Sequence, residues 1–412
     1  MTAQSTPAKP RQRLAFNNEL IVPALAILTA LIVGSVVIVF TNFGVLDILG
    51  GTATGNLAGA MWSAIATAYG SMFEGSIGNF GAIVDAFASG DSRAIGQALY
   101  PIAESLATTT PYILAGLAVA VSFRCGMFNI GVEGQIFLGA IFATYVGYAF
   151  TGLPAVLHIT LAVLAGALGG ALWAAIPALL KARAGAHEVI TTIMLNYVAY
   201  RLTDWLLAGP MQREGSTNPI SPMILPTAEL PRLLPDPARF HIGFFIALAV
   251  AFGVWWLLFR STIGFEIRTV GANPDAARYS GMNVTRNLVL AMCLSGALAG
   301  LAGANQVLGL NRTMTTGISG GLGFDAIALA LLGKSHPFGV VAASFLFGVL
   351  RAGATKMQSV ASIPTDLISI IQALVIAFIA APAIVPAPLM RVPRRRPRGL
   401  RPLELSASGG YR

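Results

Sequence analysis

The chain has 412 residues, of which 55% are hydrophobic and only 10% are charged. A soluble protein of this length exposes far more charge, so the composition excludes that class and indicates a helical membrane protein. Several apolar runs exceed the ~20 residues that a helix needs to cross a bilayer, whereas the period-2 alternation of a membrane β-barrel is not the dominant pattern. The formal net charge is +9, and it is unevenly spread along the chain.

Basic residues precede the first apolar run and follow the last one. Residues 1–18 form a leader that includes Lys9 and Arg13, and residues 391–412 form a tail that includes Arg391 and Arg396. Cytoplasmic flanks of membrane helices carry an excess of Lys and Arg, so both termini are predicted to be cytoplasmic. A basic tail beside a membrane more often meets anionic lipid than nucleic acid, so nucleic acid is not an expected partner.

Between these ends, residues 19–390 are predicted to form an all-α, polytopic transmembrane domain of about ten helices. The first span covers about 20–40, and two spans flank a polar break near 126–134. The remaining spans are expected at about 155–180, from 187 onward, and at 240–259, 288–308, 318–332, 337–350 and 367–384. An even number of spans agrees with two cytoplasmic termini.

Two polar stretches are predicted to lie outside the cell. Residues 43–108 are rich in Gly, Ala and Ser and carry scattered charges, which favours amphipathic helices on the membrane surface. A membrane span within 43–108 would make the number of spans odd and would place the two termini on opposite sides of the membrane. Residues 208–239 contain seven prolines, and we expect this external loop to meet a protein that delivers the solute.

A glycine-rich polar segment interrupts the apolar sequence between Arg124 and Gln135. It contains Asn129, Glu133 and Gln135 among several glycines. Because lipid cannot satisfy the hydrogen bonds of irregular backbone, such a segment lines a cavity or packs against protein.

Five polar residues inside apolar segments are candidates for a solute path. Ionisable groups there are costly and often functional, and amide and carboxylate groups can bind the ring nitrogens or hydroxyls of a solute. The alternative is that they brace helix breaks by bonding to free backbone groups. The candidates are Asn129, Glu133, Gln135, Asn196 and Asp325.

Residues 309–335 form a second glycine-rich break, after which Asp325 heads a short apolar run. The run is either a half-helix or part of a tilted span from about 318 to 332. We favour the span, because Lys334 and His336 then lie on the cytoplasmic side. Each half of the chain thus has a polar break followed by paired spans, which suggests internal repeats with half-helices near the midplane.

Residues 264–284 form a polar interruption between two long apolar runs. Asn273 is a good N-cap, Pro274 suits the first helical position, and Gly281 supplies a stop, which together predict a short surface helix. On composition alone, a simple connector is the more common role for such a loop.

Two motifs resemble those of membrane permeases in ATP-binding-cassette (ABC) importers, in the inner-membrane branch that handles branched-chain amino acids, simple sugars and nucleosides. The first is the segment from Gly126 to Gln135, which matches a Gly-x-Phe-Asn-Ile-Gly-x-Glu-Gly-Gln signature. The second matches the cytoplasmic coupling loop, and its residues are Arg268, Gly271, Asn273, Pro274, Ala276, Ala277, Arg278, Tyr279 and Gly281. The match covers most of the chain from about residue 109 and looks most like the nucleoside permeases.

The resemblance implies a permease subunit in a bacterial cytoplasmic membrane. Its implied partners are ABC ATPase subunits, a second permease, an external solute-binding lipoprotein and the lipid bilayer. The coupling loop would dock in a groove of the ATPase, which would bind ATP and Mg²⁺, while this chain would bind no cofactor. Members commonly have Asn before Glu-Val-Ile where this chain has His187.

No pattern in the sequence points to catalysis. We find no paired carboxylates, no Cys/His metal set, and no Lys-Ser/Thr after the glycines of 320–323 that would complete a phosphate-binding loop. We therefore expect neither catalytic residues nor a metal site. The alternatives to a nucleoside importer are a simple-sugar importer, an ATP-independent secondary transporter, and a structural membrane subunit.

Overall fold

A computed structural model describes residues 15–51, 54–235, 237–361, 363 and 366–380. The predicted tail at 391–412 and most of the predicted leader lie outside these residues. Within them the secondary structure is helical except for two isolated β-bridges, Ile220–Thr315 and Arg232–His241. The all-α prediction is therefore confirmed.

The described helices follow one another with few long connections. They are α1 (Ala15–Thr41), α2 (Phe43–Leu49), α3 (Leu57–Ile77), α4 (Phe80–Ser89), α5 (Ser92–Arg124), α6 (Val132–Ala149), α7 (Ala155–Ala184), α8 (Glu188–Ala208), the 3₁₀ turn η2 (Pro226–Ala228), α9 (Gly243–Arg260), α10 (Thr262–Ala272), α11 (Pro274–Tyr279), α12 (Val284–Asn305), the π-helix η3 (Gln306–Asn311), α13 (Leu322–Leu332), α14 (Pro337–Ala361) and α15 (Asp366–Ala380).

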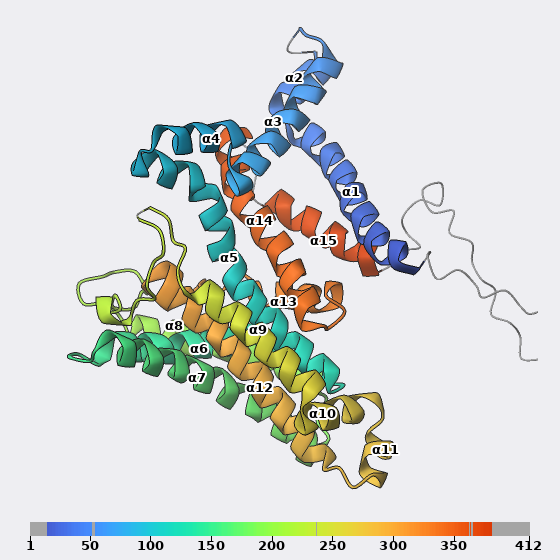
Figure 1. Cartoon of the computed structure of the whole chain (residues 1–412), viewed down its shortest axis with the longest axis vertical. Helices are drawn as coiled ribbons and strands as arrows, with labels where there is room; N and C mark the ends of the chain where they lie inside the picture. Colours follow the sequence, from blue (N-terminus) through green and yellow to red (C-terminus); the bar gives the residue numbers. More distant parts are fainter. Residues whose placement is uncertain (1–14, 52–53, 236, 362, 364–365, 381–412) are drawn as a thin grey trace, which may run out of the picture.

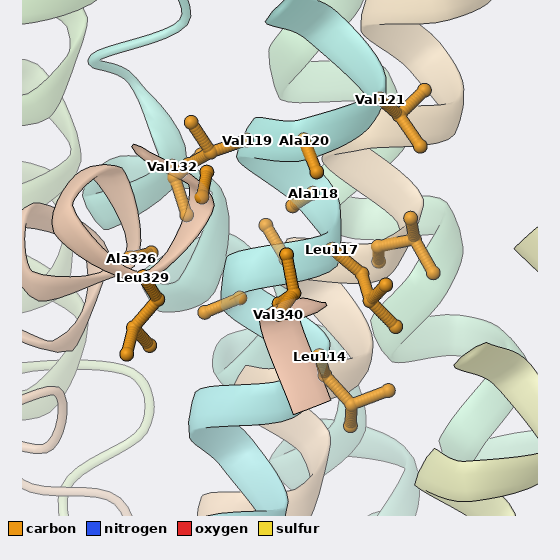
Figure 2. Close-up of a cluster of buried hydrophobic side chains, with 14 of the residues drawn as sticks. Leu114, Leu117, Ala118, Val119, Ala120, Val121, Val132, Ala326, Leu329 and Val340 are labelled. Atoms are coloured by element: carbon orange, nitrogen blue, oxygen red, sulfur yellow. The ribbon is translucent and has the colours of Figure 1, made fainter. Parts of the chain in front are cut away.

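Helix α5 runs through the middle of the molecule (Figure 1). Every residue from Thr109 to Ser122 is buried, as expected for a helix that is apolar on all sides. Figure 2 shows side chains of α13 (Ala326 and Leu329) and Val340 of α14 beside those of α5. A Cβ at Gly116 would lie 2.7 Å from Val340 Cγ1, so α14 crosses α5 at close range.

Glycines allow α6, α7 and α12 to pack backbone against backbone. A Cβ at Gly170 would lie 2.1 Å from the carbonyl oxygen of Gly296, and one at Gly300 would lie 2.1 Å from that of Gly166. On α6, a Cβ at Gly139 would lie 2.3 Å from the Gly300 Cα. At these positions any larger residue would force the backbones apart, so glycine is what allows the close helix contact.

Helices α1, α3 and α15 form a second apolar cluster with α14. Ile38, Met72, Leu350 and Ile371 are buried in it. Tyr69 of α3 donates a hydrogen bond of 2.6 Å to the Leu31 carbonyl of α1. Part of the stretch predicted as an external insertion thus packs along α1 and α14, while α4 exposes Phe80, Val84 and Phe87.

Helices lie at all ten positions where spans were predicted, but they differ in length. Among the described residues, five helices are long and apolar enough to cross a membrane, namely α5, α7, α9, α12 and α14, and the bent pair α1–α2 would make six. The protein is thus a polytopic membrane protein. The prediction of a full span at 318–332 is wrong, because α13 begins at Leu322 and has only 11 residues. A helix of that length is about 16 Å long and cannot cross ~30 Å of hydrocarbon, so the half-helix alternative fits.

The two ends of the bundle carry different connections. Figure 1 shows α10 and α11 at one end, and the segment 209–242 at the opposite end of α6 and α9. That segment is anchored by hydrogen bonds from the Leu225 N–H to Gly147 O (2.9 Å) and from the Leu230 N–H to Leu308 O (2.9 Å). The predicted coupling loop and the predicted external loop are therefore well separated.

Candidate functional site

The segment 264–284 contains the short helix predicted from its sequence. The Asn273 side chain accepts hydrogen bonds from the N–H groups of Asp275 (3.0 Å) and Ala276 (3.1 Å). Pro274 is the first residue of α11, and Gly281 has a φ of +80° after the helix ends. The capping signals are confirmed. Sequence reasoning missed α10, which precedes α11 and starts at a Ser261 cap that accepts from the Gly264 N–H at 3.1 Å.

Two glycines hold α10 tightly against the bundle. A Cβ at Gly264 would lie 1.9 Å from the Leu257 carbonyl oxygen, and one at Gly271 would lie 2.2 Å from that of Arg124 at the end of α5. The guanidinium groups of Arg124 and Arg268 lie 5.4 and 5.1 Å from the Phe259 ring centroid. Arg124 also donates from Nε to the Ser335 carbonyl at 2.9 Å. Helix α10 is therefore packed against α5 and linked through Arg124 to the turn between α13 and α14.

Helix α11 has one buried residue and is otherwise exposed. Ala277 is fully buried against the bundle, whereas Tyr279 is 94% exposed. Asn273, Pro274, Ala276 and Arg278 are also exposed. Beside α11 lies a cavity of about 430 Å³ that is lined by Phe265, Glu266, Met282 and Arg286 among others. The predicted coupling residues from Asn273 to Gly281 thus divide into a buried anchor, Ala277, and an exposed face, while Arg268 and Gly271 on α10 are partly buried.

A buried network of amide hydrogen bonds holds the polar segment between α5 and α6 in place. The Asn129 Nδ2 group donates to Gln135 Oε1 at 3.1 Å and to the Ser295 hydroxyl of α12 at 2.9 Å. The Asn129 Oδ1 atom accepts from the Gly131 N–H at 3.0 Å and from Gln135 Nε2 at 3.2 Å. Ser295 in turn donates to the Ala118 carbonyl at 2.6 Å. This network ties the break to α12 and to α5.

Asn196 braces the same break from α8. Its Oδ1 atom accepts from the Gly134 N–H at 2.9 Å, and its Nδ2 group donates to the Ile130 carbonyl at 3.0 Å. Both polar atoms of the amide therefore satisfy backbone groups. The geometry favours the bracing alternative for Asn129, Gln135 and Asn196.

Glu133 joins the two polar breaks of the chain. Its carboxylate accepts from the Gly323 N–H at 2.7 Å and from the Ser319 hydroxyl. A Cβ at Gly323 would lie 2.3 Å from the Glu133 nitrogen, so the first turns of α6 and α13 touch. Since no side chain within α13 caps its N-terminus, the carboxylate fills that role and also meets the positive end of the helix.

Asp325 lies two residues after Gly323 and has other hydrogen-bond partners than the four residues above. It is half-buried and accepts a hydrogen bond of 3.1 Å from the Tyr112 hydroxyl of α5. The positive charge of Arg351 on α14 also acts on it. Sequence reasoning missed Tyr112, Ser295, Ser319 and Arg351. Of these, only Arg351 carried a signal, because it is a charge within the apolar run of α14.

Comparison with known proteins agrees with this architecture. Residues 102–380 match the family described as branched-chain amino acid transport system, permease component. The chain is 42% identical over 285 residues to the guanosine ABC transporter permease protein NupP of Bacillus subtilis, a match covering 69% of this chain and 82% of that protein. It is 36% identical over 307 residues to the nucleoside ABC transporter permease protein NupB of Lactococcus lactis (72% and 82% coverage). It is also 37% identical over 289 residues to the glucose ABC transporter permease protein TsgB13 of Haloferax volcanii (68% and 76% coverage). No solved structure matches the chain significantly.

The family match spans well over half of the sequence, including most of α5 and all of α6 to α15. The chain belongs to the family of permease components of branched-chain amino acid transport systems. It is an ABC transporter permease, so its task is transport and not catalysis.

Proposed function

We propose that this protein is the permease of an ABC importer for nucleosides. The single observation that carries the proposal is the 42% identity to a guanosine permease over 82% of that protein's length. The chain would move its solute by alternating access, and a separate ATPase subunit would bind ATP and Mg²⁺. An ATP-independent secondary transporter is a less favoured alternative.

The exposed face of α11 is the proposed contact with the ATPase. Small residues such as Ala276 let a partner surface approach closely, and Tyr279 offers a large exposed ring beside them. The remaining predicted coupling residues, Arg268 and Gly271, fix α10 on the bundle. The docked helix would move with the ATPase and carry that movement into α5 and α13.

The complex is proposed to contain a second, different permease. Bacillus subtilis has a second guanosine permease, NupQ, which is 29% identical to this chain over 258 residues. Related permeases therefore occur as different chains under one solute name, which supports a heterodimer. An external solute-binding lipoprotein would meet the segment 209–242.

The proposed location is a bacterial cytoplasmic membrane, with α10 and α11 on the cytoplasmic side. Both termini would be cytoplasmic, and the helices at the ten predicted positions would lie in the membrane, α13 as a half-helix. The basic residues at the two ends of the sequence support this orientation.

A sugar importer is the second candidate, because a glucose permease is 37% identical to this chain. The two candidates differ in the solute that stabilises the cognate binding protein and enters through the assembled complex. We would screen nucleosides, nucleobases, pentoses and glucose by thermal shift and uptake. Nucleoside uptake is the expected result, whereas glucose or pentose uptake without nucleoside uptake would contradict the nucleoside proposal.

A further inference from the structure

Two adjoining cavities lie at the end of the bundle opposite α11. One, of about 350 Å³, lies between α5, η3 and the glycine-rich loop before α13. The other, of about 540 Å³, lies between α3, α5 and α14. Both are lined by Thr108, Arg239 and Arg351, so these three residues form a shared wall. Each cavity falls in the size range of small-molecule sites.

Each arginine of the shared wall has an acidic residue nearby. Arg239 donates from Nε to Glu104 Oε2 at 3.2 Å, and its Nη2 atom pairs with the other carboxylate oxygen. Arg351 is attracted to Asp325, the residue that also accepts the Tyr112 hydroxyl. Lys356, which also lines the larger cavity, pairs with Glu74 at 2.9 Å. Three cations and three carboxylates therefore balance in charge, which suits an uncharged polar solute better than an anion.

The wall also offers directed hydrogen-bond donors. A guanidinium carries five N–H donors, and the bonds of Arg239 to Glu104 use two of them. Arg351 extends from α14 to the glycine loop, since its Nη2 atom would lie 3.9 Å from a Cβ at Gly320. The π-helix η3 adds the amides of Gln306 and Asn311 to the same cavity, and π-helices are frequent at functional sites.

We propose that this pair of cavities is the outer solute-binding site, and that Arg239 and Arg351 bind a purine nucleoside by its base. The inference rests on the proposed function and adds where the solute binds. A planar guanidinium donates a matched pair of hydrogen bonds to the oxygen and ring nitrogen on one edge of guanine, and it can also stack on the ring. The amides of η3 suit ribose hydroxyls. The buried amides of the break at 126–135 then stay structural.

The test uses the complete complex in proteoliposomes with guanosine as the solute. We expect Arg351→Gln and Arg239→Gln each to raise the KM for guanosine about tenfold, as the loss of one charge-assisted bond predicts. The matched control is Arg201→Gln, because Arg201 is exposed on α8 and pairs with Asp204 outside the cavities. Its KM is expected to equal that of the unmodified complex.

A labelling experiment covers the case in which an arginine variant fails to assemble. Thr108→Cys places a thiol on the shared wall, and Thr217→Cys places one at an exposed position of the segment 209–242. Both are made in a Cys293→Ser background, because Cys293 is only partly buried. Cys125 is buried and needs no replacement. Guanosine is expected to slow labelling of Cys at 108 by a membrane-impermeant reagent and to leave that at 217 unchanged.

The outcomes separate the site from the function. Suppose first that the unmodified complex imports guanosine. The proposed site is then overturned, and the nucleoside importer stands, if the arginine variants have the same KM as the unmodified complex. The same holds if guanosine does not slow labelling at position 108. If the unmodified complex imports glucose or a pentose and no nucleoside, the function itself is overturned and the inference falls with it.

Discussion

Glu133 illustrates how one buried carboxylate can hold two helix ends together. It is 2% exposed and accepts hydrogen bonds from Gly323 and Ser319. Glu133→Gln replaces one acceptor oxygen with a donor, so one partner loses its bond at a cost of about 1–3 kcal/mol. We expect a lower unfolding temperature of the purified protein and an unchanged KM for its solute.

The matched control for this prediction is Asp85→Asn on α4, because Asp85 is exposed. It should leave both the unfolding temperature and the KM as they are. A tenfold change in KM for Glu133→Gln at an unchanged unfolding temperature would show that Glu133 contacts the solute instead.

His241 predicts a pH dependence of stability. The side chain is buried, its Nδ1 atom accepts from the Gly243 N–H at 3.1 Å, and burial together with Arg232 lowers its pKa from 6.5 to about 4. Between these values the unfolded chain binds a proton that the folded chain does not bind. Stability is therefore fully present above pH 6.5 and declines as the pH falls toward 4, by up to roughly 3 kcal/mol.

Thermal unfolding at pH 7.5 and at pH 5 tests this dependence. The difference between the two unfolding temperatures should shrink in His241→Gln and persist in His187→Gln, whose side chain is exposed. An equal difference in the unmodified protein and in His241→Gln would rule out His241 as its source.

At the scale of elements, the crossing of α7 and α12 depends on glycine. An added Cβ at Gly300 would lie 2.1 Å from the Gly166 carbonyl oxygen, so the two backbones must move apart. We expect Gly300→Ala to destabilise the protein by about 1–3 kcal/mol, the usual cost of overpacking. Gly253→Ala on α9 is the control, because nothing lies within 4 Å of its added Cβ. Equal unfolding temperatures of both variants would contradict the close contact.

Helix α11 allows a similar comparison on its two faces. Ala276 is exposed and Ala277 is buried, so only the first can be enlarged without disturbing the bundle. Ala276→Arg should leave membrane insertion and ATP hydrolysis intact while lowering solute uptake at least tenfold, because the docking surface is blocked. Ala184→Arg, at the exposed end of α7, should keep normal uptake. Normal uptake by Ala276→Arg would count against docking through α11.

The features that could be predicted best from the sequence are those that depend only on neighbouring residues. Asn273, Pro274 and Gly281 act within one short segment, and the helix they predict is present. The partners of Asn129 and Glu133 could not be predicted, because Ser295 and Ser319 lie more than 160 positions away. The span at 318–332 failed because the glycines before Leu322 form turns and leave a short helix. The first failure concerns contacts between distant segments, and the second concerns local turns formed by glycines whose effect on the helix start was not predicted.

At the scale of the whole molecule, the two ends of the bundle have distinct proposed tasks. The end with α10 and α11 would receive the movement of the ATPase, and the end with the two cavities would receive the solute. Between them, α5 extends from Glu104 and Thr108 at the cavities to Arg124 beside Gly271. Since α5 is continuously buried from Thr109 to Ser122, we expect it to be the most direct mechanical link between the two proposed sites.

The central claim is that a separate ATPase drives this permease. The most direct test is guanosine uptake by the reconstituted complex with ATP, with a non-hydrolysable analogue, and with a sodium or proton gradient in the absence of the ATPase. We predict uptake only when ATP is hydrolysed. Uptake that persists without the ATPase under an ion gradient would contradict this account and identify a secondary transporter.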